Sequence, residues 1–281
     1  MRLEFLGTDG AVMTPRPGCS CGVCVEARER GVPYSRTGPS LFLHGWNMLF
    51  DTPEESKAQL VRAGIERVDA CLYSHWHPDH TAGRRVFESM NFDFRAWPRR
   101  PFAVTDVYLP QQVAADFGTW MGLRAHFAFL EERLRVVRVH ELADGETVEF
   151  DGLSIRPFRL AEDYVYAFEL RAEGRRALVA MDELHGWAPP DELVGIDLAI
   201  LPFGICELDP FTGERRLAAE HPVLAAEATY PETLEIVRRL GAQRTILAHV
   251  EEMDGLSHDA LQELGARDGV EIAWDTLLVE L

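Results

Sequence analysis

In the first half of the chain, short apolar runs alternate with polar and glycine-containing segments. Runs of this kind, rich in β-branched and aromatic residues, are typical of strands that are buried in a sheet. The pattern predicts strands at residues 3–6, 40–43, 47–51, 68–73 and 104–109. Between them, residues 54–63 have helical apolar spacing and are followed by Gly64, which predicts a helix that ends there.

The second half of the chain continues with strand patterns in its middle and helical patterns around them. Strands are predicted at 135–139, 147–150, 153–158, 164–171, 176–180, 197–204, 245–249 and 271–281. Helices are predicted at 111–117, 123–133, 218–240 and 257–264. Strands that cluster in this way, with helices outside them, indicate an α+β fold in which two packed sheets are covered by helices.

The length of 281 residues allows one large domain with an ample core, and we predict a single domain over residues 1–281. No apolar run reaches the ~18 residues of a membrane span. The chain enters its first strand almost at once, without a charged and then apolar leader. These features favour a cytoplasmic protein with no membrane partner.

Acidic residues outnumber basic ones by 46 to 28, which gives a formal net charge of −18. A surface this acidic repels phosphate backbones, so a long nucleic acid is disfavoured as a partner and a small-molecule substrate is favoured. The composition does not decide the oligomeric state, and a homodimer stays open.

The strongest chemical signal is the segment Ser74–His80, SHWHPDH, directly after the predicted strand at 68–73. His75 and His77 alternate, so in extended backbone both side chains point to the same side and can share one cation. Pro78 turns the chain, and Asp79 and His80 can then face a second cation close to the first. The segment predicts a metal site.

A second cluster of ligand-type residues lies near the beginning of the chain. Cys19, Cys21 and Cys24 place three thiols on one turn, a spacing that suits tetrahedral zinc. Cys71 and Cys206 each stand alone in apolar surroundings and are predicted to be buried thiols. We therefore expect one structural zinc at the cysteine turn.

The pattern H-x-H-x-D-H in this segment resembles the metallo-β-lactamase superfamily of hydrolases. The resemblance implies a four-layer αββα sandwich with a two-metal site at one edge of the sheets. It also implies that Asp182, at the end of a strand, bridges the metals and that His249 is the last ligand. With the cysteine turn added, the chain is similar to the branch typified by the phosphoribosyl cyclic phosphodiesterase of the carbon–phosphorus lyase pathway.

The chain departs from this family pattern at two positions. Family members usually carry a histidine ligand before the strand that leads to the bridging Asp, and Glu162 falls in that position here. The alternative is that Glu162 is a solvated carboxylate and a ligand is lost; His140 and His185 fit the position less well. At the cysteine site the resemblance puts the fourth ligand at Glu252, with His258 as the alternative.

The implied arrangement is a two-metal hydrolase that uses zinc, manganese or iron. One cation would be held by His75, His77, Glu162 and Asp182, and the other by Asp79, His80, His249 and Asp182. A water that bridges two cations about 3.5–4 Å apart loses its proton near neutral pH and becomes a nucleophile. As a ligand of one of these cations, Asp79 is also counted as a catalytic residue. For protonation of the leaving group we favour His221 over Glu227, although His221 also suits an ordinary helix start.

Three functions fit these residues. The first is a phosphodiesterase that acts on a small, possibly cyclic, phosphate ester. The second is hydrolysis of a thioester, lactone or lactam, and the third is a non-catalytic metal-binding or sensing protein. The segment 91–101, which contains Arg95, Arg99 and Arg100, is either a wall of the substrate cleft or a solvated loop.

Overall fold

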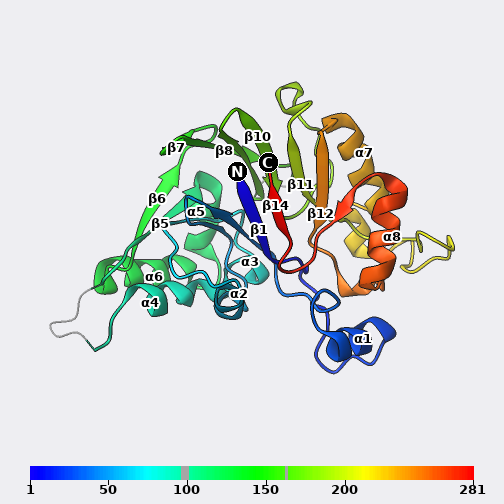
Figure 1. Ribbon diagram of the computed structural model, residues 1–281, viewed down its shortest axis with the longest axis horizontal. Helices are drawn as coiled ribbons and strands as arrows, with labels where there is room; N and C mark the ends of the chain where they lie inside the picture. The colour runs from blue at the N-terminus through cyan, green and yellow to red at the C-terminus, as the bar shows by residue number, and fades with distance from the viewer. Residues whose placement is uncertain (96–100, 162–163) are drawn as a thin grey trace.

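The computed structural model describes residues 1–95, 101–161 and 164–281 and shows two β-sheets with helices on their outer sides (Figure 1). In the described residues the first sheet has seven strands in the order β14-β1-β2-β3-β4-β5-β6. Its strands are β1 (Arg2–Gly7), β2 (Ser40–His44), β3 (Met48–Phe50), β4 (Ala70–Leu72), β5 (Thr105–Pro110), β6 (Val137–Leu142) and β14 (Leu278–Glu280). The strands from β3 to β6 run parallel to one another, and the others are antiparallel to their neighbours.

The second sheet also has seven described strands, in the order β13-β12-β11-β10-β9-β8-β7. They are β7 (Val148–Phe150), β8 (Leu153–Arg159), β9 (Tyr166–Ala172), β10 (Arg175–Ala180), β11 (Leu198–Pro202), β12 (Arg244–Ala248) and β13 (Glu271–Ile272). From β10 to β13 the strands are parallel. Their carboxyl ends therefore lie at one edge of the sheet, the edge where α/β sheets place ligands.

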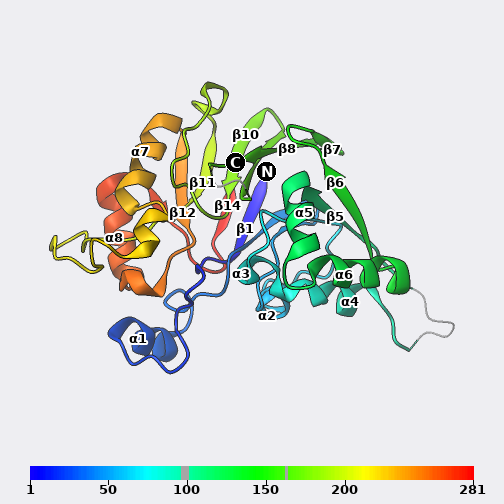
Figure 2. The ribbon, with the colours of Figure 1, turned by 180° about the vertical axis from the view of Figure 1, so that it is seen from behind.

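The helices divide between the two sides of the sandwich, as Figures 1 and 2 show. On the side of the first sheet lie α2 (Ser56–Arg62), α3 (Pro78–Thr81), α4 (Val86–Asn91), α5 (Gln111–Thr119) and α6 (Leu123–Ala128), and on the other side α7 (Tyr230–Leu240) and α8 (His258–Asp268). Helix α1 (Gly22–Arg30) lies beyond the sheets. Short turns complete the chain: η1 (Ala82–Arg85), η2 (Phe129–Leu134), η3 (Asp191–Leu193), η4 (Pro222–Ala225) and η5 (Glu252–Asp254). None of the described helices is both long and apolar enough to cross a membrane.

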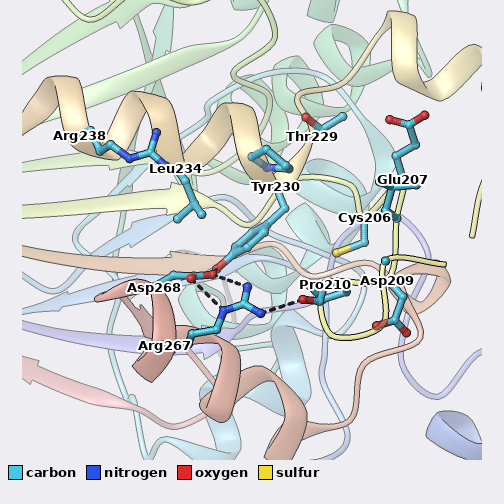
Figure 3. Close-up of a pocket in the computed structure, with 13 residues that line it drawn as sticks. Cys206, Glu207, Asp209, Pro210, Thr229, Tyr230, Leu234, Arg238, Arg267 and Asp268 are labelled. Atoms are coloured by element: carbon cyan, nitrogen blue, oxygen red, sulfur yellow. Dashed lines mark hydrogen bonds and ion pairs between the residues drawn. The ribbon is translucent and has the colours of Figure 1, made fainter. Parts of the chain in front are cut away.

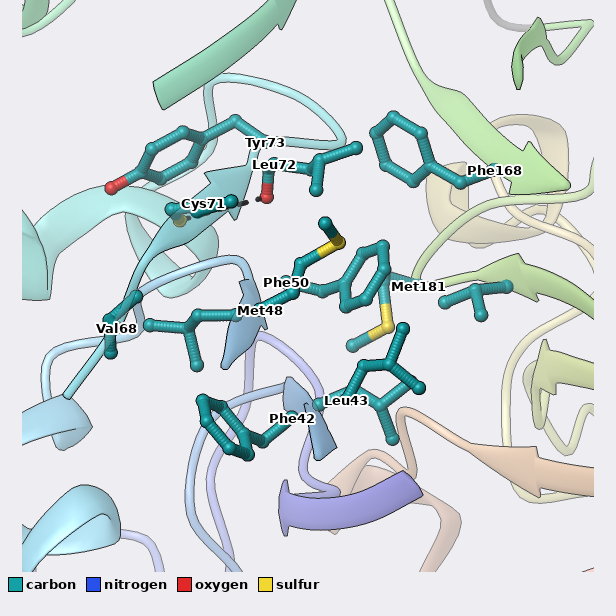
Figure 4. Close-up of a cluster of buried hydrophobic side chains, with 14 of the residues drawn as sticks. Phe42, Leu43, Met48, Phe50, Val68, Cys71, Leu72, Tyr73, Phe168 and Met181 are labelled. Atoms are coloured by element: carbon teal, nitrogen blue, oxygen red, sulfur yellow. Dashed lines mark hydrogen bonds between the residues drawn. The ribbon is translucent and has the colours of Figure 1, made fainter. Parts of the chain in front are cut away.

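Apolar side chains fill the space between the two sheets (Figure 4). Phe50 from the first sheet and Phe168 from the second have ring centroids 5.7 Å apart, and both are fully buried. A second buried cluster, which includes Leu201, Ile236 and Leu261, packs between the second sheet and helices α7 and α8. Since β11 is covered on both faces, all five of its residues are buried. The predicted four-layer αββα arrangement is confirmed.

The predicted closing strand at 271–281 is wrong in extent, because the chain there changes sheets. β13 pairs with β12 in the second sheet, and β14 pairs with β1 in the first. Between them lies Asp275, whose buried carboxylate accepts hydrogen bonds from Thr8 Oγ1 and Thr37 N at 2.9 and 3.0 Å. Thr276 follows with a φ of 78°, a left-handed conformation that turns the chain away from the second sheet.

The predicted beginnings of one helix and one strand were also wrong. The helix predicted from 218 begins only at Tyr230, where Thr229 and Glu232 form a capping box and Pro231 lies in the first turn. The strand predicted from 135 begins at Val137, because the helix before it continues to Leu134 and Arg135 has a φ of 59°. In both places, the backbone geometry at a helix end determines where the element begins, and the apolar pattern does not show this.

Candidate metal centre

The predicted metal ligands come from three loops that follow strands. The histidine segment follows β4 of the first sheet, Asp182 follows β10, and His249 follows β12 of the second sheet. The backbone N–H of Tyr166, at the beginning of β9, donates to Ser74 O at 3.0 Å and ties the histidine segment to the second sheet. All three loops therefore meet where the edges of the two sheets come together.

Among the described residues the loops form two groups of possible ligands that lie beside each other. The groups are His75, His77 and Asp182, and Asp79, His80 and His249; the ligand atoms within each lie within 4.8 Å of one another. Asp182 Oδ2 lies 3.2 Å from His75 Nε2 and 3.7 Å from His80 Nε2. Its Oδ1 lies 3.5 Å from His249 Nε2. Asp182 thus faces both groups, which is the position that a shared ligand requires.

Buried polar atoms without partners show that these residues fit cations. His75 Nε2, His80 Nε2, His249 Nε2 and Asp79 Oδ2 are buried and have no hydrogen-bond partner. Unpaired buried polar atoms are costly, so a cluster of four aimed at one place indicates a missing binding partner. Burial, and then the neighbouring His75, lowers the pKa of His77 to about 4, which keeps its imidazole in the neutral form that binds metals.

The other ring nitrogen of His80 is held by Asp51, a residue that the sequence analysis did not connect with the site. Asp51 Oδ2 lies 2.8 Å from His80 Nδ1, and the same oxygen accepts from Ser74 Oγ at 2.7 Å. Its Oδ1 accepts from Ser74 N at 2.8 Å. Asp51 therefore fixes the orientation of the His80 ring, and with it the direction of Nε2. Asp51 is fully buried directly after β3 and has a φ of 57°, features that the folded structure reveals and the sequence does not.

We expect Asp51→Ala to lower the affinity of the centre for divalent cations. Loss of a residue that only supports a ligand costs roughly 10–100-fold in metal affinity, because the imidazole is no longer held in its binding orientation. Competition with a chromophoric chelator measures this directly. Asp51→Asn is the matched variant, since its amide oxygen can still accept from His80, and its loss should be smaller. Equal affinity in Asp51→Ala and the unmodified protein would contradict the role of Asp51.

His249 is held by a network that reaches the N-terminal segment. Its Nδ1 lies 3.8 Å from Glu251 Oε1, and the Glu251 carboxylate accepts from Ala11 N and Val12 N at 2.8 and 2.7 Å. His249 itself has a φ of 53°, unusual for a residue with a side chain, and such a conformation persists only where the surroundings enforce it. Glu251 was not identified from the sequence, because it stands between two predicted ligands without a motif of its own.

The predicted cysteine site is also assembled. The Sγ atoms of Cys19, Cys21 and Cys24 lie 3.1, 3.2 and 3.1 Å from Glu252 Oε1. Arg16 Nε lies 3.3 Å from Glu252 Oε2, which places a positive charge beside these acidic groups. The alternative ligand His258 lies instead in edge contact with the rings of Tyr34 and Trp274, at 5.3 and 5.7 Å. The structure thus places Glu252 with the cysteines.

The segment that connects His249 with Glu252, here called the 249–252 segment, pairs with residues 8–12. Val250 N donates to Thr8 O, Gly10 N to Val250 O and Glu252 N to Val12 O, at 3.0, 3.0 and 2.9 Å. A Cβ atom on Gly10 would lie 2.0 Å from Glu251 Oε1, so a larger residue there would displace the Glu251 carboxylate. Two residues, Val250 and Glu251, therefore separate His249 of one candidate metal site from Glu252 of the other.

Several predicted residues do not join these groups. Glu162 lies outside the described residues, as do Arg99 and Arg100; Arg95 is exposed and pairs with Asp93. His140 Nε2 lies 2.8 Å from Asp106 Oδ1 on the neighbouring strand, and His185 follows the Asp182 loop without entering either described group. Tyr164 has its ring 5.3 Å from that of His77, so the chain after residue 163 runs beside this ligand.

Of the two predicted proton donors, Glu227 has the closer position. His221 begins the turn η4, where its Nδ1 accepts from Val223 N at 3.2 Å. Glu227 lines a small cavity together with Asp182, Glu183 and His249, whereas His221 is not among the described residues that line it. Burial, and then the charge of Asp182, raises the pKa of Glu227 to about 7.

Among the described residues, candidate metal ligands line one of two larger cavities and not the other. One, of about 340 Å³, is lined by Gly10, Ala11, Met13, Gly38, Glu54, Glu55, His77, Pro78 and Asp79 and so opens beside the candidate ligands. Another, of about 370 Å³, lies between the loop after β11 and helices α7 and α8 (Figure 3). There Arg267 already pairs with Asp268, which also accepts from Tyr230 Oη, so these polar groups are mutually satisfied. The cavity beside His77 and Asp79 is the candidate substrate site.

Comparison with known proteins matches this geometry. The family model for the Beta-lactamase superfamily domain matches residues 45–250, which include both groups of candidate ligands. The chain belongs to this superfamily. The prediction of a metallo-β-lactamase superfamily protein, made on the histidine segment, is confirmed.

Individual relatives in this superfamily match part or all of the chain. Ribonuclease Z of Archaeoglobus fulgidus is 30% identical over 165 residues, which cover 56% of this chain and 43% of that protein. Two crystal structures align with the whole chain at a TM-score of 0.73: a diphosphatase from the PhnP family, 23% identical with 97% of its chain covered, and Zn²⁺-bound PqqB from Methylobacterium extorquens, 17% identical with 100% covered. At these identities the structures show the shared fold. The chain spans less than half the length of the curated ribonuclease Z relatives that it matches.

Proposed function

We propose that this protein is a metal-dependent hydrolase of a small phosphodiester. The observation that carries the proposal is the pair of ligand groups on either side of Asp182, with unpaired buried nitrogens aimed between them. The candidate substrate cavity opens beside His77 and Asp79 of these groups. Two divalent cations, when bound there, would supply Lewis-acid activation of water and of the substrate's oxygens.

The protein's own residues would bind the cations, orient them and move a proton. Asp51 holds Nδ1 of His80 by a hydrogen bond, so Nε2 of this ring stays directed at the centre. Glu251 places a carboxylate oxygen 3.8 Å from Nδ1 of His249. Glu227, with its pKa raised to about 7 by burial, can hold a proton near neutral pH and donate it from its carboxyl group to a leaving alkoxide. This assignment replaces our preference for His221, which is not among the described residues that line the small cavity shared by Glu227, Asp182 and His249.

The relatives support a phosphate ester over other substrates. The names of two of them, a diphosphatase and ribonuclease Z, describe action on phosphorus–oxygen bonds, whereas the name of PqqB describes no reaction. The ribonuclease Z similarity also makes RNA processing a second candidate. A net charge of −18 opposes it, because an RNA-binding surface needs basic residues to neutralise phosphates. A small substrate is therefore favoured.

Turnover of bis-p-nitrophenyl phosphate by the metal-reconstituted protein tests the proposal. We expect phosphodiester hydrolysis in the presence of zinc, manganese or iron(II), and none after removal of the metal with a chelator. Parallel assays with a thioester, a lactone and a precursor tRNA measure the competing functions. Faster turnover of one of these would assign that function instead, and inactivity on all of them would leave a metal-binding or sensing protein.

We further propose that Glu162 is a ligand of the cation that His75 and His77 bind. The proposal rests on the family position of Glu162 and on Tyr164, two residues further on, which lies beside His77. A carboxylate in place of an imidazole favours harder cations, so the unmodified protein should prefer manganese or iron over zinc more than Glu162→His does. Metal analysis of both proteins after identical reconstitution measures the preference. An unchanged metal ratio would mean that Glu162 lies outside the ligand set.

The cysteine turn and Glu252 are proposed to hold one structural zinc. Thiolates are the preferred ligands of zinc in closed structural sites, and a carboxylate oxygen completes a tetrahedral set. Binding there would join α1, which otherwise lies beyond the sheets, to the 249–252 segment. The zinc would therefore act on stability and not on substrate.

A further inference from the structure

A cluster of aromatic side chains adjoins the candidate metal centre on the side of His77. Trp76 stands between the two ligands His75 and His77, and its ring centroid lies 4.5 Å from that of His77. Trp120 stacks on Trp76 at 4.9 Å with an interplanar angle of 21°. Tyr164 completes the cluster, 6.4 Å from Trp76 and 5.3 Å from His77. Trp76, Trp120 and Tyr164 are here called the aromatic patch.

Trp76 packs against the buried core, and the aromatic patch extends from it to the surface at Trp120. Helices α5 and α6 direct Phe117 and Phe127 inward, where both rings lie within 6 Å of Tyr73 (5.4 and 5.6 Å) and are almost completely buried. Trp120 follows α5 directly but is 46% exposed, and its neighbour Met121 is 45% exposed. Large exposed apolar side chains that lie together mark a surface that binds something.

The backbone between α5 and α6 presents Trp120 in this position. Met121 has a φ of 52° and Gly122 one of 64°, so two successive residues adopt the left-handed conformation. For methionine this conformation is unfavourable, and it is found mostly where function or packing requires it. Trp120 N donates to Asp116 O and Leu123 N donates to Trp120 O, at 2.9 and 3.1 Å, which fixes the turn on both sides.

We propose that the aromatic patch stacks a nucleobase of the substrate, so that the phosphodiester hydrolysed here is derived from a nucleotide. This inference rests on the proposed hydrolase function. The ring centroids of His77 and Trp76 lie 4.5 Å apart, and those of Trp76 and Trp120 lie 4.9 Å apart. The sugar of a nucleotide can connect a phosphate near the candidate ligand His77 with a base stacked on Trp120. The rings of the patch carry no charge and suit a planar, uncharged group, while the phosphate lies at the cations.

The charge of the chain limits the size of this substrate. Proteins that bind long single strands combine stacking rings with a basic groove that follows the backbone. A net charge of −18 and the acidic residues Glu54 and Glu55 in the adjoining cavity are opposed to such a groove. Stacking without a basic groove selects a single nucleotide unit over a polymer.

A pair of substrates with the same leaving group tests the inference. The p-nitrophenyl ester of thymidine 5′-phosphate carries a base, and methyl p-nitrophenyl phosphate carries none. For Trp120→Ala we expect KM for the thymidine compound to rise about tenfold with kcat nearly unchanged, the effect of losing one stacked base. Both constants for the methyl compound should stay as they are. Trp120→Phe should restore most of the loss, and Phe211→Ala, which removes an aromatic ring of similar exposure (43%) from the loop after β11, is the control.

A binding measurement separates this inference from the proposed function. Adenosine 5′-monophosphate should quench tryptophan fluorescence in the unmodified protein and less in Trp120→Ala, whereas ribose 5-phosphate should not quench it. Hydrolysis of both esters with no effect of Trp120→Ala would overturn the inference and leave the hydrolase in place. Inactivity on both esters would overturn the function, and the quenching result would then decide for or against the patch. A change in association state of Trp120→Ala in light scattering would show that the patch joins two copies of the chain and would overturn the inference.

Discussion

Asp182→Ala is expected to abolish phosphodiester turnover and to lower the metal content of the centre. Asp182 is the residue whose two carboxylate oxygens face both groups, at 3.2 Å from His75 Nε2 and 3.5 Å from His249 Nε2. Loss of a residue that merely supports a ligand already costs roughly 10–100-fold, so loss of a shared ligand should cost more than about 100-fold in kcat/KM. Metal analysis should show fewer than two equivalents at the centre after dialysis.

Asp106→Ala is the matched control for this variant. Asp106 also places a carboxylate oxygen beside a histidine, 2.8 Å from His140 Nε2, but it lies on β5 outside the described ligand groups. The control should retain both metal and turnover. Wild-type turnover in Asp182→Ala would show that the centre does not depend on a shared carboxylate, and the proposed mechanism would be wrong.

Cys21→Ser is expected to lower stability strongly and to leave the chemistry of the folded protein in place. A ligand present at about 1,000 times its Kd stabilises the native state by about 4 kcal/mol, and this contribution is lost when zinc no longer binds. At roughly 2–4 °C per kcal/mol for chains of 150–250 residues, Tm should fall by about 10 °C. Calorimetry measures the fall, and metal analysis should show the loss of one zinc.

Ser20→Ala separates the loss of a ligand from a general disturbance of the cysteine turn. Ser20 stands between Cys19 and Cys21 but contributes no ligand, so its variant should keep the zinc and the Tm. A chelator should lower the Tm of this control by more than it lowers the Tm of Cys21→Ser, because the control still holds the structural zinc. If Cys21→Ser retained its zinc, or lost it without any change in Tm, the structural role of the site would be contradicted.

Most strands could be predicted because their residues are apolar on the faces that the fold buries. The central strands, such as β11 and β12, were found in their correct places for this reason. The end of the chain was predicted wrongly. Residues 271–281 have the pattern of one strand, but they form two short strands that belong to different sheets. The division depends on Asp275 and its partners Thr8 and Thr37, which lie more than 230 positions away in the chain. A local pattern carries no information about such contacts.

The ligands could be predicted to the extent that they form a motif. The spacing within the histidine segment identifies its residues as candidate ligands. Asp182, His249 and Glu252 followed from the family resemblance, and the fold places each of them in a different candidate group. Asp51 and Glu251 could not be recognised, because a carboxylate that supports a ligand has no fixed spacing from it. Glu227 was named as a candidate proton donor but ranked below His221, because its position depends on how the loop before α7 lies beside Asp182.

The segment from His249 to Glu252 is a spacer of fixed length between the two candidate metal sites, with two residues, Val250 and Glu251, between its ends. Either end can accept a new donor atom if its side chain reaches the same point, so a histidine at position 252 is a reasonable exchange for the glutamate. Insertion or deletion of a single residue is different, because it would shift Val250 and Glu252 out of their hydrogen bonds with residues 8–12. Such a change would move either His249 or Glu252 away from its candidate metal site. Metal selectivity can therefore be altered here by substituting one of the two end residues, but not by changing the length of the segment.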